Sequence, residues 1–509
     1  MPSLYRDEKW LVVNKPSGIS THRAHDGDLG LVEWLKLHYD LPVYICSRLD
    51  KGTSGVLVFA LTPEAVGEAQ TIHENNTSKK TYFFIAKKSS HTSWVCSQSL
   101  DNKSCETHFS KVKEGAVYAL YKAVIHRGRT HQIRRHAAVS DIPLLGDEQY
   151  GGPVFPRLCL HCGAVNWPGI DHMLQIDPPE WFDACLDGLS ETITSQALAE
   201  KRWPFLSAIT DCCRLIHRGE YTEDIAVDKY GEFLCVTGFD ESLSAAQHLH
   251  RLGAMLATLS QKCDCRGGVI KTNRRDPHKH DLFADFTAWG KPVPESFVVQ
   301  EHGLQFRVAL NNRQHVGLFL DQRDSRSRIA RAAKGKRVAN LFAFTCSFSV
   351  YALAAGAEVV FSVDLAAGCL NRGKENVAIN QLANTENGKF VKEDVRKWLA
   401  RQLRKKQKNP PGFAPFDLVI CDPPVFASSG HGKSFHVEKE WSALVHGVHE
   451  ILGDEGKALF ANNHQTGSEH YYSDTLKKIF SEVTVLKPPV DFPQVAGQPS
   501  HVRIYWCRK

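Results

Sequence analysis

The second half of the chain alternates short apolar runs with amphipathic stretches from residue 336 onward. Strands that alternate with helices in this way predict an open, mostly parallel sheet. The runs expected to form strands are residues 338–344, 359–363, 416–421 and 458–461. The clearest helix lies between the last two strands, because one face of the helical pattern collects Trp441, Leu444, Val445, Val448 and Ile451.

The first half has a different pattern, in which strand-like runs such as residues 10–13 and 55–60 are separated by turn residues. A polar stretch follows, and the apolar spacing over residues 205–216 then predicts a helix. We therefore expect a multidomain α/β and α+β chain. Its parts would be a mixed-sheet unit over 1–183, a linker over 184–200, a small α+β unit over 201–310 and a Rossmann-like unit over 311–509.

The composition is that of a folded globular chain. Of 509 residues, 42% are hydrophobic and 23% are charged, which excludes a disordered or collagen-like protein. Because no apolar run reaches the roughly 18 residues of a membrane span and no secretory signal is evident, we expect a cytoplasmic protein without a membrane partner. The net charge of +6 is compatible with a nucleic-acid partner but does not by itself indicate one.

The 15 cysteines include two close pairs, Cys159 with Cys162 and Cys263 with Cys265. A zinc site would need two such pairs at regular spacing, and these two lie in unlike contexts far apart in the sequence. We therefore expect buried thiols, a reduced compartment and no metal. A separate feature is the run over residues 401–408, which holds five basic residues in eight and fits a solvated loop or an RNA-facing patch equally well.

The first candidate site combines the segment over residues 47–55 (SRLDKGTSG) with that over residues 128–136 (GRTHQIRRH). Asp50 precedes a turn and a buried strand, so its carboxylate would be held rigidly, and Arg48 and Arg134 would keep it ionised. A lone carboxylate among arginines suits attack at a sugar carbon. On spacing alone, a structural Asp–Arg ion pair is the alternative.

These segments closely resemble RluA-type pseudouridine synthases over roughly residues 4–183. The resemblance includes the opening Asn14-Lys15-Pro16 step, the Arg-Leu-Asp motif at residues 48–50 and the Lys-Thr-Tyr step at residues 80–82. It implies a catalytic domain without a cofactor, in which Asp50 is the nucleophile, Tyr82 stacks on the base and completes proton transfer, and Arg134 pairs with Asp50. Three further residues, Arg48, Arg129 and His131, would contact the RNA and hold the flipped nucleotide. Ser47 departs from the family, which usually has His at that position.

The second candidate site is a set of polar residues that follow successive strands of the predicted parallel sheet. Asp364, Asp394 and Asp422 each come at a strand end, where ligands bind in open α/β sheets. A Rossmann dehydrogenase is disfavoured because no Gly-x-Gly-x-x-Gly follows the first strand. The other alternative is that these aspartates are ordinary loop residues with no shared role. Several carboxylates at successive strand ends are not expected by chance.

This second set resembles class I S-adenosylmethionine-dependent methyltransferases, and more narrowly the large-subunit rRNA methyltransferases of the RlmI/RlmK group, over roughly residues 200–509. The resemblance implies a pocket for S-adenosyl-L-methionine lined by Phe319, Asp321, Arg323, Phe344, Asp364, Asp394 and Asp422, with Asp422 also catalytic. It implies that the substrate contacts Pro423, Pro424, Phe426, Asn462 and Asn463. One departure is Cys346, where the family has Gly, since a Cβ there would crowd the cofactor.

The methylated atom depends on whether a cysteine nucleophile is present, because methylation of cytosine C5 requires one. Relatives that methylate cytosine carry it where this chain has Asn462 and Asn463, and Cys421 lies inside a strand. Guanine N7 is already nucleophilic and needs only orientation. Asn462-Asn463 and Asp491-Phe492 resemble the guanine-N7 branch, so N7 is favoured, with guanine N2 second and cytosine C5 third.

The sequence thus predicts a bifunctional RNA-modifying enzyme, a pseudouridine synthase fused to a methyltransferase. Its expected partner is RNA, either 23S rRNA or a large-subunit assembly intermediate. Two alternatives stay open: a tRNA-directed enzyme, and an RNA-binding ribosome assembly factor with one decayed active site. Fusion would raise the effective concentration of the second domain if the two targets lie near each other.

Overall fold

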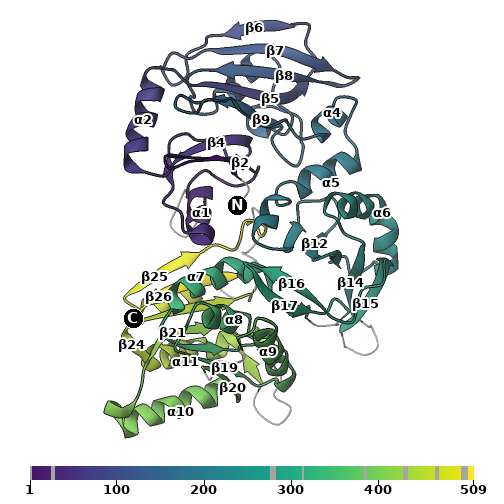
Figure 1. Cartoon of the computed structure of the whole chain (residues 1–509). Helices are drawn as coiled ribbons and strands as arrows, with labels where there is room; N and C mark the ends of the chain where they lie inside the picture. Colours follow the sequence, from purple (N-terminus) through teal and green to yellow (C-terminus); the bar gives the residue numbers. More distant parts are fainter. Residues whose placement is uncertain are drawn as a thin grey trace. The chain divides into compact units, whose positions relative to one another are not determined.

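The computed structural model describes residues 3–23, 29–275, 282–311, 315–382, 387–427, 434–464, 469–494 and 502–509. The chain folds into two units (Figure 1). Unit 1 contains the described residues up to 209 together with those of 215–291. Unit 2 contains residues 210–214 and the described residues of 292–509.

Unit 1 is built on a large mixed sheet. Its main strands are β1 (Ser3–Arg6), β2 (Trp10–Lys15), β4 (Ser54–Ala60), β5 (Lys79–Lys87), β6 (Ser93–Cys96), β7 (Thr107–Glu114), β8 (Tyr118–Ile125) and β9 (Leu160–Asn166). They pair in the order β1-β2-β4-β9-β5-β8-β7-β6, and the short β3 (Tyr44–Ile45) and β10 (Leu174–Gln175) pair with β4 and β9. Only the β4–β9 pair among these is parallel. The helices of this part are α1 (Leu31–Tyr39), α2 (Pro63–Glu74), α3 (Gln132–Val139) and α4 (Trp181–Cys185).

A second, smaller sheet has the order β11-β12-β13-β14-β15. Its strands are β11 (Cys212–Ile216), β12 (Ile225–Tyr230), β13 (Phe233–Gly238), β14 (Gly267–Arg275) and β15 (Leu282–Gly290). Helix α6 (Ala245–Lys262) crosses between the parallel strands β13 and β14 and begins with a capping box in which Ser244 and Gln247 each hold the other's backbone N–H. The helix expected over residues 205–216 is therefore wrong, because only Phe205–Ala208 form a short 3-10 helix before β11 begins.

The segment expected to be a linker, residues 184–200, contains helix α5 (Glu191–Ala199). The Ser190 hydroxyl caps its N-terminus by accepting a hydrogen bond from the Ile193 N–H. Its apolar face, with Ala197 and Leu198 fully buried, packs against α6. This stretch is therefore a packed helix, although its polar composition is typical of a linker.

Unit 2 is a seven-stranded sheet with the order β20-β19-β18-β21-β24-β26-β25. Its strands are β18 (Arg337–Leu341), β19 (Val359–Asp364), β20 (Gly388–Lys392), β21 (Phe416–Cys421), β24 (Leu452–Asn462), β25 (Glu482–Leu486) and β26 (Arg503–Arg508). The first five in space run parallel, and β26 lies antiparallel between β24 and β25. The four strands predicted from the sequence correspond to β18, β19, β21 and β24, so the prediction of an open parallel sheet is confirmed.

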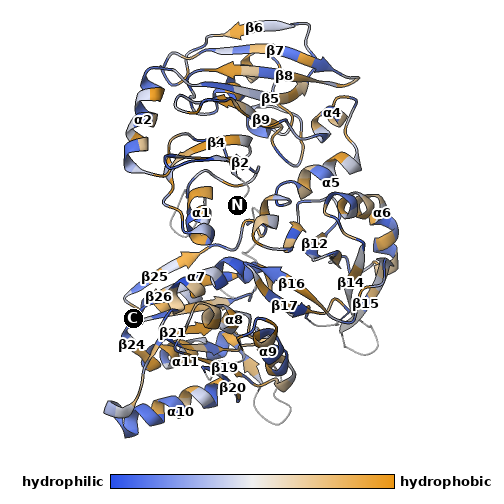
Figure 2. Cartoon of the chain, viewed as in Figure 1, coloured by the Kyte–Doolittle hydropathy of each residue, from blue (hydrophilic) through white to orange (hydrophobic). Residues whose placement is uncertain are grey.

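The helices of unit 2 are α7 (Arg323–Ala333), α8 (Ser347–Ala354), α9 (Ala367–Ile379), α10 (Val395–Lys408), α11 (Val437–Ile451) and α12 (Glu469–Lys477). A hairpin of β16 (Phe297–Glu301) and β17 (Leu304–Val308) precedes them, and the short β22 (Phe426–Ala427) and β23 (Phe435–His436) form another. Large buried rings, including Trp398, Trp441 and Phe460, fill the core, and Figure 2 shows apolar residues along the central strands.

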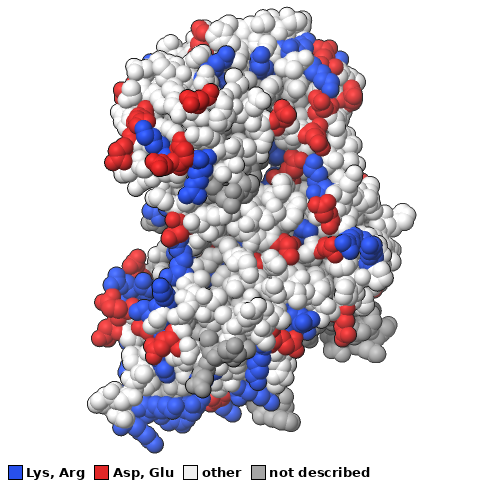
Figure 3. Space-filling view, in the orientation of Figure 1, with Lys and Arg blue, Asp and Glu red and all other residues white. Residues whose placement is uncertain are grey.

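Lys and Arg side chains gather over α10 (Figure 3). No helix among the described residues is long and apolar enough to cross a membrane. The described part of the chain also contains no cluster of three His, Cys, Asp or Glu residues with metal-binding geometry. Three members of the two cysteine pairs, Cys159, Cys162 and Cys263, are buried as expected, and Cys265 is partly exposed.

Candidate active sites

Asp50 lies in the loop between β3 and β4, with 30% of its side chain exposed. The loop borders a cavity of about 980 Å³. All six residues predicted for the first site line this cavity, namely Arg48, Asp50, Tyr82, Arg129, His131 and Arg134. The fold therefore brings together residues that lie up to 86 positions apart in the sequence.

Arg134, on the buried face of α3, is the closest cation to Asp50. Its Nη1 lies 3.6 Å from the Asp50 Oδ2, while its Nε and Nη2 donate to the carboxylate of Asp147 at 2.8 and 2.7 Å. Gln149 accepts a further hydrogen bond of 3.0 Å from Nη2. Burial opposes the charge of Arg134, but Asp147 and Asp50 outweigh it and raise the pKa of the guanidinium. Asp147 thus fixes the arginine so that one nitrogen faces Asp50.

His131 approaches Asp50 from the residue before α3. Its Nε2 lies 3.9 Å from the Asp50 Oδ1, and its Nδ1 lies 2.9 Å from the hydroxyl of Tyr150. The residue has a φ of 53°, a left-handed conformation that a β-carbon disfavours. Strained conformations of this kind concentrate at functional sites.

Lys15 holds the loop that carries Asp50. This fully buried lysine at the end of β2 donates from Nζ to the carbonyl oxygens of Pro16 at 2.9 Å, Lys51 at 3.3 Å and Thr53 at 2.7 Å. Burial and the positive charge of Arg157 lower the pKa of Lys15 to about 7. No role for Lys15 was predicted, although it lies in the Asn14-Lys15-Pro16 step.

Tyr82 lies on β5 and has only 6% of its surface exposed. Burial, together with the Cys162 thiol and the negative charge of Asp50, raises the pKa of its phenol well above the ordinary value. The phenol therefore stays protonated near neutral pH, so that it presents a neutral ring and a hydroxyl donor beside the cavity.

The second set of predicted residues lies at the carboxyl edge of the unit 2 sheet. Asp364 ends β19, Asp394 follows β20 by two residues and Asp422 follows β21 directly. Asn462 ends β24. Because these strands are parallel, their carboxyl ends share one edge, and the four side chains belong to neighbouring strand ends.

Asp364 organises the loop after β18. Its Oδ2 accepts a hydrogen bond of 2.8 Å from the backbone N–H of Phe344, and its Oδ1 accepts one of 2.8 Å from that of Ala366. In this loop Phe342, Phe344 and Cys346 all have positive φ, at 57°, 47° and 60°. Three non-glycine residues in that conformation within five positions concentrate backbone strain at this strand end.

Two aromatic rings stand at the same loop. The ring of Phe344 lies 5.2 Å from that of Phe319, which is 45% exposed. His315 packs edge-on against Phe344 at 5.4 Å. A partly exposed aromatic pair next to a strand end offers a stacking surface for a planar ligand.

Asp394 caps α10 and holds Arg396. Its Oδ1 accepts from the Arg396 backbone N–H at 2.9 Å, and its two oxygens accept from the Arg396 guanidinium at 3.1 and 2.7 Å. The side-chain hydrogen bond from Arg396 outweighs desolvation and lowers the pKa of Asp394. The carboxylate is therefore ionised and oriented.

Asp422 has the opposite electrostatic environment. Burial raises its pKa to about 7, the negative charge of Asp321 adds to this, and Arg326 opposes it. The following Pro423 is buried, whereas Pro424 and Phe426 are exposed, and the ring of Phe426 packs edge-on against His436. A carboxylate that titrates near neutral pH beside an exposed aromatic ring is typical of a reactive site.

The two predicted asparagines differ in exposure. Asn462 is fully buried, and its Nδ2 has no hydrogen-bond partner among the described residues, while its Oδ1 accepts from the His464 N–H at 3.3 Å. Asn463 is exposed. A buried amide donor without a partner among the described residues is costly, so we expect a water molecule, a ligand or another segment to accept its hydrogen bond.

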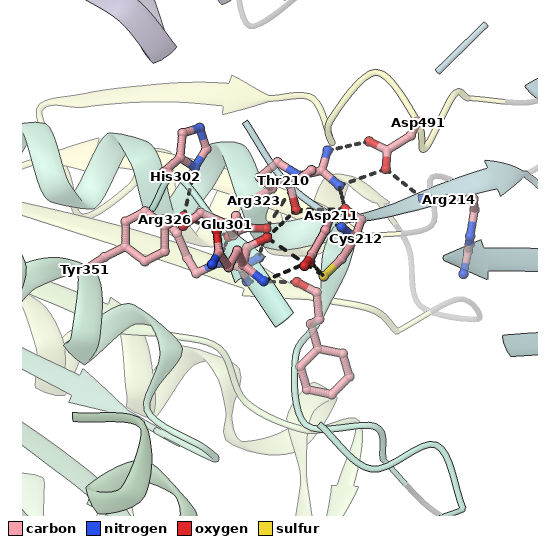
Figure 4. A network of polar contacts seen from close by, with 12 residues as sticks. Thr210, Asp211, Cys212, Arg214, Glu301, His302, Arg323, Arg326, Tyr351 and Asp491 are labelled. Carbon is pink, nitrogen blue, oxygen red and sulfur yellow. Dashed lines mark hydrogen bonds and ion pairs between the residues drawn. The ribbon is translucent and has the colours of Figure 1, made fainter. Parts of the chain in front are cut away.

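Arg323 belongs to a buried ion network instead of the strand-end set. Its Nη1 and Nη2 donate to the two carboxylate oxygens of Asp491 at 2.8 and 2.9 Å, and Nη2 also donates to the Cys212 carbonyl at 3.0 Å (Figure 4). Glu301 lies 3.4 Å from its Nε and also binds Arg326 at 2.7 and 2.9 Å. The guanidinium of Arg323, which the sequence predicts in the cofactor pocket, is taken up by protein groups, and this argues against a direct contact with the cofactor.

Cys346, where a Cβ was expected to crowd the cofactor, points into the protein. It is fully buried in a small apolar cluster with Ala343 and Leu370. Its side chain faces Gly373 on α9, where a Cβ would lie 2.4 Å from the Cys346 Sγ. The missing side chain at Gly373 thus makes the room that Cys346 occupies.

Comparison with known proteins agrees with these two sites. Residues 216–502, more than half of the chain, match the family described as S-adenosylmethionine-dependent methyltransferase. The chain belongs to this methyltransferase family. Residues 9–139 match the family described as RNA pseudouridylate synthase, so the chain carries a pseudouridine synthase domain ahead of its methyltransferase domain.

The relatives are named as ribosomal RNA methyltransferases. Ribosomal RNA large subunit methyltransferase K of Neisseria meningitidis serogroup B is 34% identical over 241 residues, which cover 47% of this chain and 65% of the relative. Ribosomal RNA large subunit methyltransferase K/L of Pseudoalteromonas translucida is 37% identical over 247 residues, which cover 47% of this chain and 32% of the relative. The chain thus spans less than two thirds of the length of these relatives.

Solved structures agree on the fold. The crystal structure of a methyltransferase in complex with SAH superposes with a TM-score of 0.53 at 23% identity, and covers 66% of this chain and 85% of the other. A SAM-dependent methyltransferase from Streptococcus mutans gives a TM-score of 0.50 over the same shares. At this identity the likeness establishes the fold of the methyltransferase part.

Proposed function

We propose that this chain is a bifunctional rRNA-modifying enzyme, which converts uridine to pseudouridine at Asp50 and methylates guanine N7 beside Asp422. The observation that carries the proposal is the presence of two separate carboxylate sites, each within a domain of matching family. We place the pseudouridine synthase domain within residues 1–183, the auxiliary α+β part within 201–310 and the methyltransferase fold within 311–509, in the cytoplasm.

The first reaction needs a nucleophile, a cation to hold it and a neutral stacking ring. Asp50 would attack the ribose C1′ as the bond from C1′ to the base N1 breaks. The turned base would then bond to C1′ through C5 and displace the Asp50 carboxylate. The C5 hydrogen leaves as a proton and N1 gains one, so atoms balance without a cofactor. Arg134 would hold the Asp50 carboxylate in place, and Tyr82 would stack on the base and serve the proton transfer. Arg48, Arg129 and His131 would hold the flipped nucleotide.

The second reaction needs a methyl group, which bound S-adenosyl-L-methionine supplies. The strand-end residues fit this group chemically, because Asp364 and Asp394 present carboxyl oxygens as acceptors for hydroxyl and amino groups and the Phe319–Phe344 pair offers a stacking surface. We include Asp321 and Asp422 in this pocket and leave Arg323 out. Pro423, Pro424, Phe426, Asn462 and Asn463 would contact the target base.

Guanine is favoured over cytosine because a reactive thiol is missing from the strand ends that the structure describes. Cys421 is buried, and burial with the charge of Asp422 raises the pKa of its thiol. Burial likewise raises the pKa of Cys346 to about 12. Cytosine C5 needs a thiolate, whereas guanine N7 needs only alignment with the methyl donor. The Asn462-Asn463 step also resembles the guanine-N7 branch.

Guanine N2 is the second candidate, and the environment of Asp422 favours it. An exocyclic amine must lose a proton when it is methylated, and a carboxylate with a pKa of about 7 is suited to accept it. Methylation at N7 requires no proton acceptor.

The experiment is to incubate the full chain and S-adenosyl-L-methionine with unmodified large-subunit rRNA and, separately, with unmodified tRNA. Mass spectrometry of the nucleosides then separates 7-methylguanosine, N2-methylguanosine and 5-methylcytidine. We expect 7-methylguanosine on rRNA only. Modification of tRNA alone would overturn the proposed substrate, and N2-methylguanosine would select the second candidate. Absence of every product on naked rRNA and on precursor particles would leave the assembly-factor alternative standing.

A further inference from the structure

Helix α10 has an unusual charge, with seven basic and no acidic residues among its 14. Its charge alone exceeds the formal net charge of +6 of the whole chain. The opposite face anchors the helix through Val395, Trp398 and Leu399, all buried in the core of the unit 2 sheet. The charged face is therefore carried on a rigid support.

The basic residues form a line along one face. Lys397, Arg401, Arg404 and Lys408 follow one another at intervals of four, three and four residues, which places them within one narrow sector of an α-helix. At a rise of 1.5 Å per residue this line, the α10 stripe, is about 16 Å long. Arg401 is paired with Glu393 at 2.6 Å.

The other three members of the α10 stripe are exposed and uncompensated. Within the described ranges, Lys397, Arg404 and Lys408 have no ion-pair or hydrogen-bond partner on their side chains. Lys405 flanks them and is also exposed. Figure 3 shows that Lys and Arg side chains gather over α10. The favourable interaction of cations with the carboxyl end of a helix explains Lys405 and Lys408 in the last turn, but it does not reach Lys397.

The α10 stripe begins at the strand-end site. Lys397 comes three residues after Asp394, the residue that caps α10 at the carboxyl edge of the sheet. Lys392, which is exposed, ends the edge strand β20 on the same edge. A polyanion that leaves the strand-end site would thus meet a row of cations that leads away from it.

We propose that the α10 stripe binds the phosphodiester backbone of the RNA substrate and so positions it for the methyltransferase site. This inference rests on the proposed function for the class of partner. A row of four cations, three of them unpaired among the described residues, suits phosphate contacts, which fix the register of the RNA without reading its sequence. The stripe would contribute affinity and salt dependence and leave the choice of base to the strand-end site.

The test compares two variants of the full chain with equal loss of charge. The first is Lys397→Gln/Arg404→Gln/Lys408→Gln, and the matched control is Lys457→Gln/Lys477→Gln/Lys478→Gln, whose lysines are exposed on β24 and at the end of α12. The measurements are the Kd for a labelled, unmodified large-subunit rRNA fragment over a range of salt concentrations, and the Kd for S-adenosyl-L-methionine.

We expect the first variant to bind RNA at least about tenfold more weakly at low salt and to lower the slope of log Kd against log salt by about 2 to 3, because each lost phosphate contact removes close to one unit of slope. The control should retain the wild-type slope, and both variants should bind S-adenosyl-L-methionine normally. Wild-type affinity and slope in the first variant would overturn the inference. Failure of the wild-type chain to bind S-adenosyl-L-methionine would instead count against the proposed methyltransferase and leave the RNA result interpretable.

Discussion

Cys346 and Gly373 are complementary across the first loop of the methyltransferase fold. A Cβ at position 373 would lie 2.4 Å from the Cys346 Sγ and 2.8 Å from its Cβ, distances that real atoms do not adopt. Cys346 takes a left-handed conformation with a φ of 60° at the N-terminus of α8. The side chain that replaces the family's glycine is therefore directed against α9, where a glycine receives it.

This pairing predicts a strongly non-additive double mutant. Gly373→Ala should destabilise the fold by about 1 to 3 kcal/mol, as overpacking does. In the Cys346→Gly background the same change should cost far less, because the colliding atoms are gone. The measurement is the melting temperature of the transition that S-adenosyl-L-methionine shifts upward. Equal costs of Gly373→Ala in both backgrounds would contradict the account.

The buried ion network predicts that Asp491 stabilises the fold. Asp491→Ala would leave the fully buried Arg323 without its bidentate partner, which typically costs about 3 to 5 kcal/mol. The exposed pair of Glu455 with Arg508 provides the control, since Glu455→Ala should cost less than about 1 kcal/mol.

The same network predicts that Arg323 has no direct role in cofactor binding. Arg323→Met/Asp491→Leu removes both charges together and should recover most of the stability that Asp491→Ala loses. Isothermal titration of the folded double variant should give a Kd for S-adenosyl-L-methionine within about twofold of wild type. A loss of affinity of tenfold or more would instead indicate that Arg323 contributes to cofactor binding.

We predict that the charged carboxylate of Asp422 lowers the stability of the fold, although the methyltransferase site uses it. Its pKa is raised to about 7 in the folded chain from 3.8, so the folded state binds more protons between these values, and stability is lost as the pH rises through that window. Asp422→Asn should therefore have a higher melting temperature than wild type at pH 8, because its free energy of unfolding is larger by about 1 to 3 kcal/mol. Near pH 4 the two proteins should be equally stable. An Asn variant less stable than wild type at pH 8 would show that the carboxylate is favourably solvated.

Asp147 is predicted to act as a positioning residue for pseudouridine formation. Asp147→Asn keeps its size but removes the charge that fixes Arg134 beside Asp50, so the rate should fall by up to about a hundredfold at unchanged RNA affinity. Release of tritium from RNA labelled at uridine C5 measures this rate. Asp147→Glu should restore part of it, and methylation should be unaffected. Equal damage by both substitutions would indicate a purely structural role.

The sequence predicted the parallel sheet of unit 2 because its strands and helices have clean periodicities, as for α11 with Trp441 and Val445. It also predicted residues that share the first cavity, since Asp50 and Arg134 lie in motifs with recognisable spacing. Asp147 lies only 13 residues beyond Arg134, within a segment rich in turn residues, but no pattern identifies it as the partner of that arginine.

Other features depend on contacts that a local pattern does not contain. Arg323 lies 168 positions from Asp491, so no local pattern in the sequence predicts this ion pair. The apolar spacing over residues 205–216 fits a helix, yet the stretch from Cys212 forms β11 because sheet pairing outweighs local periodicity. The apolar stripe of α5, with Ala197, is too small to stand out from its polar surroundings.

The central claim is that one chain holds two independent active sites. The most direct test incubates wild type, Asp50→Asn and Asp422→Ala with S-adenosyl-L-methionine and unmodified large-subunit rRNA, and quantifies pseudouridine and methylguanosine in the same digest. We predict that wild type makes both products, that Asp50→Asn loses only pseudouridine, and that Asp422→Ala loses only methylguanosine. The account would be contradicted if Asp50→Asn still made pseudouridine or Asp422→Ala still made methylguanosine. Loss of both products in either folded variant would also contradict it.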